Sequence, residues 1–142
     1  MQPNCPLCFP SDEHIIFAND IFRIVHVHDE FYPAYFRIIL NKHAAEMTDI
    51  NEQDAHKIFK ALLVIENQIR KILNPDKINL ASLGNVVPHL HWHIIARYKN
   101  DRHFPNPIWG NVTHTDYHVS NSLLDLEQKL ISSLMNDEII LI

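Results

Sequence analysis

The sequence predicts an α+β fold, in which an antiparallel sheet of about five strands carries one long packed helix and a C-terminal helix. Two observations lead to this prediction. Short runs of Ile, Val and Phe are separated by turn residues, and one long stretch has apolar residues at helical spacing. A chain of 142 residues is long enough for one domain with a core and too short to expect two. We therefore expect a single domain over residues 1–142.

Five segments of the chain are expected to be strands. Asn19 and Asp20 form a turn between the first two, which we interpret as a hairpin. Tyr32 and Pro33 interrupt the chain before the third strand. Gly84 ends the fourth strand, where it permits a backbone conformation that other residues avoid or the close approach of a ligand. The predicted strands span residues 14–17, 21–28, 35–40, 77–83 and 88–98.

Two segments are expected to be helices. Asp49 is the predicted N-cap of the long helix, because Glu52 three residues later completes a capping box. Asn74 and Pro75 end this helix. A second amphipathic helix is expected at about 122–135. The residues predicted to face inward are Ala55, Ile58, Phe59, Leu62, Ile65, Ile69, Ile72 and Leu73 on the first helix and Leu123, Leu126, Leu130 and Leu134 on the second.

The composition of the chain argues against some classes of binding partner. The net charge of −5 argues against a general binder of nucleic-acid backbones, which needs a clustered basic face, although a small phosphate ligand can still find a locally positive site. The sequence shows neither a signal-peptide pattern nor an apolar run of the roughly 20 residues that a membrane helix needs. We therefore expect a cytoplasmic protein with no nucleic-acid or membrane partner, whose two cysteines do not form a structural disulfide.

Three histidines dominate the stretch from 88 to 97. His89, His91 and His93 alternate with apolar residues such as Leu90 and Trp92, and a period of two indicates a strand with one buried face. The histidines then share the other face, with roughly 6.6 Å of rise between successive rings. Three imidazoles in one row are unusual for a solvated strand face and predict a functional site.

The histidine row is compatible with three interpretations. Two neighbouring rings could share a metal ion, but the third begins about 13 Å from the first and does not easily join them. Alternatively, a neutral imidazole could attack phosphorus and hold the transferred group as a phosphoramidate, with neighbouring donors stabilising the phosphate oxygens. The central His91 is then the best nucleophile. The third interpretation is a histidine-rich surface strand without function.

The run His89-Leu90-His91-Trp92-His93-Ile94-Ile95 resembles the signature of the histidine triad (HIT) superfamily. Cys5-Pro6-Leu7-Cys8 and Asn41-Lys42-His43 stand where many members carry Cys-x-x-Cys and Pro-Lys-x-His. The resemblance implies a nucleotidyl hydrolase or transferase that cleaves an α-phosphate bond of an AMP-linked or dinucleoside polyphosphate substrate through a covalent nucleotidyl-histidine. It also implies a homodimer without an organic cofactor. The competing hypothesis is a nucleotide-binding or regulatory module with little turnover.

The resemblance further assigns roles to individual residues. His91 is the expected nucleophile, His93 supports its orientation and tautomer, and His89 completes the triad. In the zinc-bearing subset of the family, the cysteines and two histidines hold a structural zinc. The expected substrate-binding residues are Asn79, Asn85 and Asp29, and the expected zinc ligands are Cys5, Cys8, His43 and His89.

The chain departs from the family pattern in two places that matter for chemistry. Val86 stands where many members have a hydroxyl donor to the phosphate, and Tyr35 stands where many have a further histidine. The change at Val86 favours slow turnover or an unusual leaving group, because losing one transition-state donor can cost about 10²–10³ in rate. The change at Tyr35 removes a histidine that would transfer a proton to the leaving group. Trp92 is expected in the core or at a dimer contact. The histidines expected to be ordinary surface residues are His14, His26, His28, His56, His103, His114 and His118.

Overall fold

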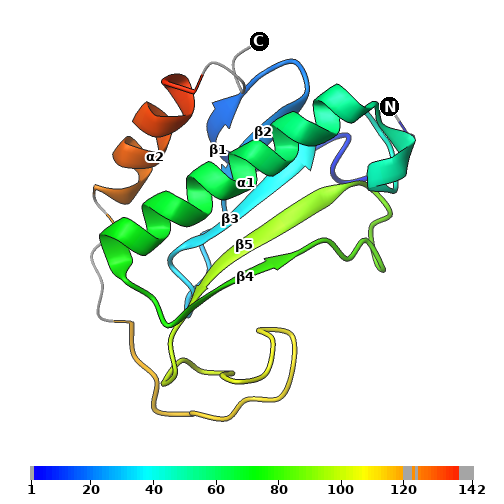
Figure 1. Cartoon of the computed structure of the whole chain (residues 1–142). Coiled ribbons are helices and arrows are strands. Elements are labelled where there is room, and N and C mark those ends of the chain that lie inside the picture. Colours follow the sequence, from blue (N-terminus) through cyan, green and yellow to red (C-terminus); the bar gives the residue numbers. More distant parts are fainter. Residues whose placement is uncertain (1, 120–122, 124, 138–142) are drawn as a thin grey trace.

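The computed structural model describes residues 2–119, 123 and 125–137, and its centre is a five-stranded antiparallel sheet (Figure 1). The spatial order of the strands is β1-β2-β3-β5-β4. The predicted α+β class and the antiparallel sheet are confirmed. The strands are β1 (His14–Ala18), β2 (Phe22–His26), β3 (Tyr35–Leu40), β4 (Lys77–Ala81) and β5 (His91–Arg97).

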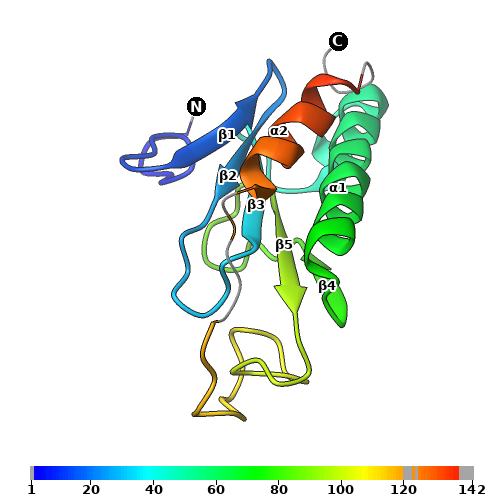
Figure 2. The same ribbon diagram turned by 90° about the vertical axis from the view of Figure 1, so that its left-hand side faces the viewer.

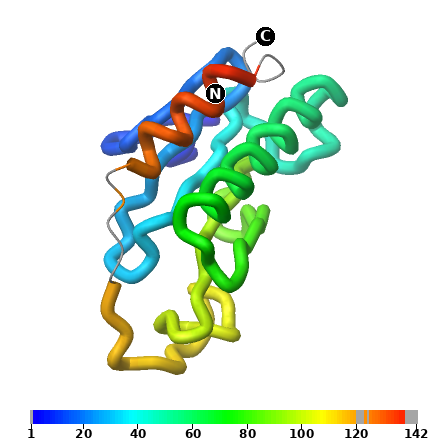
Figure 3. The backbone as a smooth tube through the Cα atoms, turned by 60° about the vertical axis from the view of Figure 1, so that its left-hand side comes forward, coloured from blue at the N-terminus to red at the C-terminus, as the bar shows by residue number. Residues whose placement is uncertain are grey.

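Two helices, α1 (Glu52–Leu73) and α2 (Leu126–Met135), pack side by side against one face of the sheet (Figures 2 and 3). Alternate residues of the strands point toward them and form the core. On the same side, Trp92 packs its ring on Phe59 of α1 with 5.7 Å between centroids, as expected for a residue opposite the histidines. The fully buried members of this core include Phe22, Ile24, Phe36, Ile94, Ala61, Ile65, Ile69, Leu130 and Leu134. The opposite face of the sheet is not covered by either helix.

The long helix starts from a different cap than predicted. Asn51 is the N-cap, and its side-chain oxygen accepts a hydrogen bond from the backbone N–H of Asp54 at 2.9 Å. Asp49 instead ends a short 3₁₀ helix, η1 (Met47–Asp49), where its carboxylate accepts from the backbone N–H of Glu46. The prediction that Asp49 caps α1 was therefore wrong, because the Asp49 side chain caps the preceding 3₁₀ helix η1. The predicted end is correct: Asn74 has a left-handed φ of 46°.

Strand β5 begins at His91, three residues later than predicted. Pro88 has no backbone N–H, and the N–H of Leu90 donates to Ala44 in the loop after β3 instead of to a neighbouring strand. His89 therefore lies in the connection before the strand. Other ends also differ, since β2 stops at His26, β4 stops at Ala81 and α2 begins at Leu126. The predicted start of α2 at residue 122 lies outside the described residues.

Among the described residues, neither helix is both long enough and apolar enough to cross a membrane.

Candidate functional site

The sheet face opposite the helices carries a cavity of about 380 Å³. His91 and His93 project into it from β5, and Arg37 projects from β3, where it lies opposite His93 in the strand register. The remaining walls come from the N-terminal loop, the β4–β5 connection and the loop after β5. The lining residues are Leu7, Arg37, Leu83, Gly84, Asn85, Val86, Val87, His91, His93 and Trp109.

His91 is held in one tautomer by the backbone. Its Nδ1 lies 2.6 Å from the carbonyl oxygen of His89. A carbonyl can only accept, so Nδ1 carries the hydrogen and Nε2 keeps a free lone pair. Burial lowers the pKa of His91 below its ordinary value, and the positive charge of Arg37 adds to this effect. The ring is therefore neutral near pH 7. The tautomer is set by the His89 carbonyl, not by His93 as the sequence led us to expect.

His93 is held in place by a series of hydrogen bonds between side chains. Its Nδ1 lies 2.6 Å from the hydroxyl of Tyr35, which also accepts from Arg37 Nη2 at 3.3 Å. Arginine only donates, so the arrangement that uses every donor and acceptor has Tyr35 donating to His93 Nδ1, with the hydrogen of His93 on Nε2. Burial, followed by the neighbouring His91 and Arg37, lowers the pKa of His93 to about 3. Burial also raises the pKa of Tyr35, so the phenol keeps its proton.

The remaining walls combine predicted and unpredicted residues. Asn85 lines the cavity as expected, and Val86 is 93% exposed at its rim. Gly84 has a φ of +70°, which its lack of a side chain permits in this turn. The sequence did not single out Arg37 or Trp109. An arginine at an alternating position of an otherwise apolar strand was a usable signal for Arg37, whereas Trp109 lies in an irregular loop and gave none.

Two residues that the resemblance assigned to the substrate lie elsewhere. Neither Asn79 nor Asp29 lines the cavity. Asn79 Oδ1 accepts from Nη1 of the buried Arg97 at 2.7 Å. Asp29 Oδ1 accepts from the backbone N–H groups of Phe31 at 2.9 Å and Tyr32 at 3.1 Å, so it organises the turn before β3. The structure gives both side chains structural partners.

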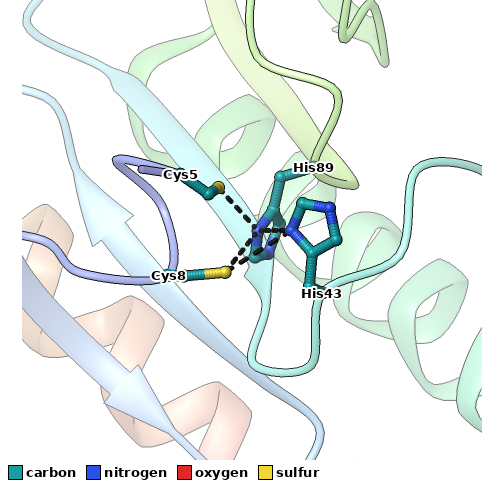
Figure 4. Close-up of side chains that lie close together, drawn as sticks. All are labelled: Cys5, Cys8, His43 and His89. Carbon is teal, nitrogen blue, oxygen red and sulfur yellow. Dashed lines mark hydrogen bonds between the residues drawn. The ribbon is translucent and has the colours of Figure 1, made fainter. Parts of the chain in front are cut away.

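Cys5, Cys8, His43 and His89 converge beside the cavity, although they come from three separate segments (Figure 4). Cys5 Sγ lies 3.4 Å from His89 Nδ1, Cys8 Sγ lies 3.4 Å from His43 Nδ1, and the two Nδ1 atoms are 3.3 Å apart. A tetrahedral zinc ion with ordinary bond lengths places sulfur and nitrogen ligands about 3.6 Å apart and two nitrogens about 3.4 Å apart. The four residues therefore fit a closed zinc site.

Neighbouring groups also orient these side chains and set the tautomer of His89 so that it can bind a metal. His89 is fully buried, and its Nε2 donates to the carbonyl of Leu40 at 2.7 Å, which leaves Nδ1 unprotonated and directed at the cysteines. Burial lowers the pKa of His89, which favours the neutral, ligating ring. The N-terminal loop is held by Arg23, whose Nη2 donates to the carbonyl of Leu7 at 2.9 Å between the two cysteines.

Some of the other histidines are not ordinary surface residues. His26 is only 7% exposed, stacks on Phe36 with 4.7 Å between centroids and contacts the Glu127 carboxylate, so the expectation for it was wrong. His14 and His28 are exposed but lie beside each other, with 2.7 Å between His28 Nε2 and His14 Nδ1. These three histidines lie together because β1 and β2 pair antiparallel, which places His14 opposite His26.

A five-stranded antiparallel sheet with paired imidazoles at the start of a central strand, beside a Cys₂His₂ cluster, is the arrangement expected of a histidine triad protein. The family model described as HIT domain matches residues 9–100. That match covers more than half of the chain, so the chain belongs to the HIT family.

Solved structures agree with this assignment. A histidine triad protein from Bradyrhizobium japonicum is 28% identical, with a TM-score of 0.67, over 87% of this chain and 89% of that one. A Zn-bound histidine triad family protein from Mycobacterium smegmatis is 15% identical, with a TM-score of 0.58, over 91% and 88% of the two chains. A HIT family hydrolase from Clostridium thermocellum is 23% identical, with a TM-score of 0.52, over 68% and 92%. No curated protein matches the sequence.

Proposed function

We propose that the protein is a nucleotidyl hydrolase or transferase that cleaves an α-phosphate bond of an AMP-linked or dinucleoside polyphosphate substrate. The observation that carries this proposal is the hydrogen bond from His91 Nδ1 to the His89 carbonyl, which leaves Nε2 as a neutral nucleophile at the cavity. The related Clostridium thermocellum protein is described as a hydrolase, which supports the same class of reaction.

The proposed reaction has two displacements at phosphorus. His91 Nε2 attacks the α-phosphorus and a P–N bond forms. The bond from phosphorus to the leaving group's oxygen or nitrogen breaks, and that atom keeps the electron pair and takes a proton from solvent. Water then attacks the same phosphorus and releases a proton, and the P–N electrons return to Nε2. The ring is positively charged while it carries the nucleotide, and the Nδ1–H bond to the His89 carbonyl stabilises that charge.

His93 and Arg37 supply the donors for the phosphate oxygens. His93 Nε2–H and the Arg37 guanidinium both belong to the cavity wall next to His91, and the His91 and His93 rings lie 4.8 Å apart. Donors fixed before the reaction stabilise the charge that develops on the oxygens without reorganising. Asn85 adds an amide to the same wall.

We also propose that Cys5, Cys8, His43 and His89 hold a structural zinc, which would tie the N-terminal loop to the segment that carries His91. Four protein ligands leave no open coordination position, so the ion takes no part in the phosphate chemistry. The Mycobacterium smegmatis relative is described as Zn-bound, which supports this assignment. Homodimer formation and a cytoplasmic location stay predictions. Phe59 is 46% exposed, so the expectation that it faces inward was wrong, and with the exposed Leu63 it is a candidate dimer contact on α1.

The alternative is a nucleotide-binding module with little turnover. Val86 favours it, because this exposed side chain at the cavity rim cannot donate a hydrogen bond. A binding module would keep the cavity and its donors but release no product.

Release of AMP from adenosine phosphoramidate and from dinucleoside polyphosphates distinguishes the two functions. The enzyme hypothesis expects turnover that falls by about 10³-fold or more in His91→Ala. Turnover should be unchanged in the control His56→Ala, which alters an exposed residue of α1. An AMP adduct on His91 should be recovered by mass spectrometry from protein quenched in base. Equal release by wild type and His91→Ala would reject the nucleophile. Calorimetric AMP binding without release from any substrate would establish the binding module.

A further inference from the structure

A second group of ligand-type side chains lies at the β1 end of the sheet. One donor atom each from His14, His28 and Glu127 lies within 4.8 Å of the other two. His14 begins β1, His28 follows β2, and Glu127 lies in the first turn of α2, so the β1–β2 hairpin meets the distant C-terminal helix there. This group shares no residue with the Cys₂His₂ cluster.

The carboxylate of Glu127 is held in place before any ion binds. His26 Nδ1 contacts Glu127 Oε1, and His26 Nε2 donates to the carbonyl of Pro33 at 2.7 Å. His26 is itself buried and stacked on Phe36. With Oε1 occupied by His26, the second oxygen Oε2 faces His14 Nε2 at 3.4 Å. That separation matches two ligands of a common metal ion better than a strong hydrogen bond, which is shorter than about 3.2 Å.

The two exposed histidines complete the arrangement. His14 Nδ1 and His28 Nε2 lie 2.7 Å apart, which requires at least one lone pair between them. His14 thus faces Glu127 with Nε2 and His28 with Nδ1, but one ring gives only one nitrogen to an ion. Because both rings are exposed, His28 can turn away from His14 Nδ1 and direct a nitrogen to the ion that His14 Nε2 and Glu127 Oε2 would share. They line a second cavity of about 540 Å³, whose wall also includes Asp12, Arg37 and Glu13, the last paired with Arg23. Arg37 also lines the cavity of His91, so the two cavities share one wall.

We propose that the convergence of His14, His28 and Glu127, with Glu127 oriented by the buried His26, forms a binding site for a divalent transition metal. Imidazole and carboxylate ligands suit Zn²⁺, Co²⁺, Ni²⁺ and Cu²⁺. Three protein ligands leave a coordination position for water or for an oxygen of an anionic ligand in the second cavity, unlike the closed Cys₂His₂ set. The proposal is independent of the phosphate chemistry.

Cobalt distinguishes the two metal sites, because thiolate ligands give a sulfur-to-metal charge-transfer band that a histidine–carboxylate site lacks. Untagged, chelator-treated protein is titrated with Co²⁺ while bound metal and the absorption spectrum are measured. We expect two ions per wild-type chain, one of them without a charge-transfer band. His14→Gln/His28→Gln should bind one ion with the band, and Cys5→Ser/Cys8→Ser should bind one ion without it.

Two further variants keep the result unambiguous. Glu127→Gln, which keeps the side-chain size and a contact for His26, should weaken the second Co²⁺ at least tenfold. The control His56→Gln/His118→Gln removes two other exposed histidines and should leave both ions bound. A wild type that binds a single ion, and binds it with the charge-transfer band, would overturn the proposal, as would an unchanged second ion in His14→Gln/His28→Gln. Failure of the Cys₂His₂ site alone would instead appear as wild-type binding without the charge-transfer band.

Discussion

The hydroxyl of Tyr35 lies 2.6 Å from Nδ1 of His93, and this contact joins the first residue of β3 to the third residue of β5. Both side chains are buried, and Arg37 donates to the same hydroxyl oxygen. When the phenol donates its hydrogen to Nδ1, His93 carries its own hydrogen on Nε2. Tyr35 stands where the family has a further histidine. Its hydroxyl still has a polar role here, because it orients His93 so that Nε2–H faces the cavity.

Tyr35→Phe should remove this control of the His93 tautomer. The variant leaves Nδ1 of a buried ring without its donor, so we expect about 1–3 kcal/mol lower stability in denaturant unfolding. The kcat for AMP release should fall at least tenfold with little change in KM, because the lost interaction acts through the transition-state donor. Tyr117→Phe, which alters a tyrosine outside the cavity, is the control. An unchanged kcat would show that the phenol does not position His93.

Val86→Ser should raise turnover. The side chain lies at the cavity rim and is 93% exposed, so the substitution adds a hydroxyl donor without disturbing the core. Since one donor to a transition state contributes up to about 10²–10³ in rate, we expect kcat to rise tenfold or more. Val86→Ala, which shortens the side chain without adding a donor, should show no such gain. Equal rates for the serine and alanine variants would mean that the hydroxyl does not reach the phosphate.

Removal of zinc should destabilise the protein. An ion that binds only the folded state contributes about 4 kcal/mol when its free concentration is 1,000 times Kd. With His14→Gln/His28→Gln also present, so that only the Cys₂His₂ site can hold an ion, a chelator should therefore lower the thermal midpoint of the protein with intact cysteines and leave Cys5→Ser/Cys8→Ser unaffected. Calorimetric scans with and without chelator measure both changes. A midpoint of wild type that does not respond to chelator would contradict the structural zinc.

Stability should fall as the pH drops below about 6.5, in part because of His93. Its folded-state pKa of about 3 lies below the unfolded value, so the unfolded chain binds more protons between these two values. The free energy of unfolding therefore decreases with falling pH, by at most about 1.4 kcal/mol per pH unit from this one group. Urea unfolding of wild type and His93→Gln between pH 6.5 and 4 tests this. Parallel curves for the two proteins would assign the dependence to other groups.

Local patterns predicted the elements well. The apolar spacing of α1, its end at Asn74 and the alternation of His91 and His93 with Trp92 reflect periodicities that a short segment carries by itself. The same reasoning failed at Asp49 and His89. In both cases a neighbouring turn or a distant loop carbonyl took the hydrogen bond that the pattern had assigned elsewhere.

The sequence by itself determined the α+β class and the alternating histidines, because both follow from the period of apolar residues. The resemblance of its motifs to the histidine triad family supplied the residues of the Cys₂His₂ cluster. Only the tertiary structure decided that His89 leaves the strand, that Arg37 faces His93 and that His26 is buried against Glu127. Each of these depends on the register between strands or on the docking of α2. Residues far apart in the chain become neighbours only when the sheet pairs and its helices pack.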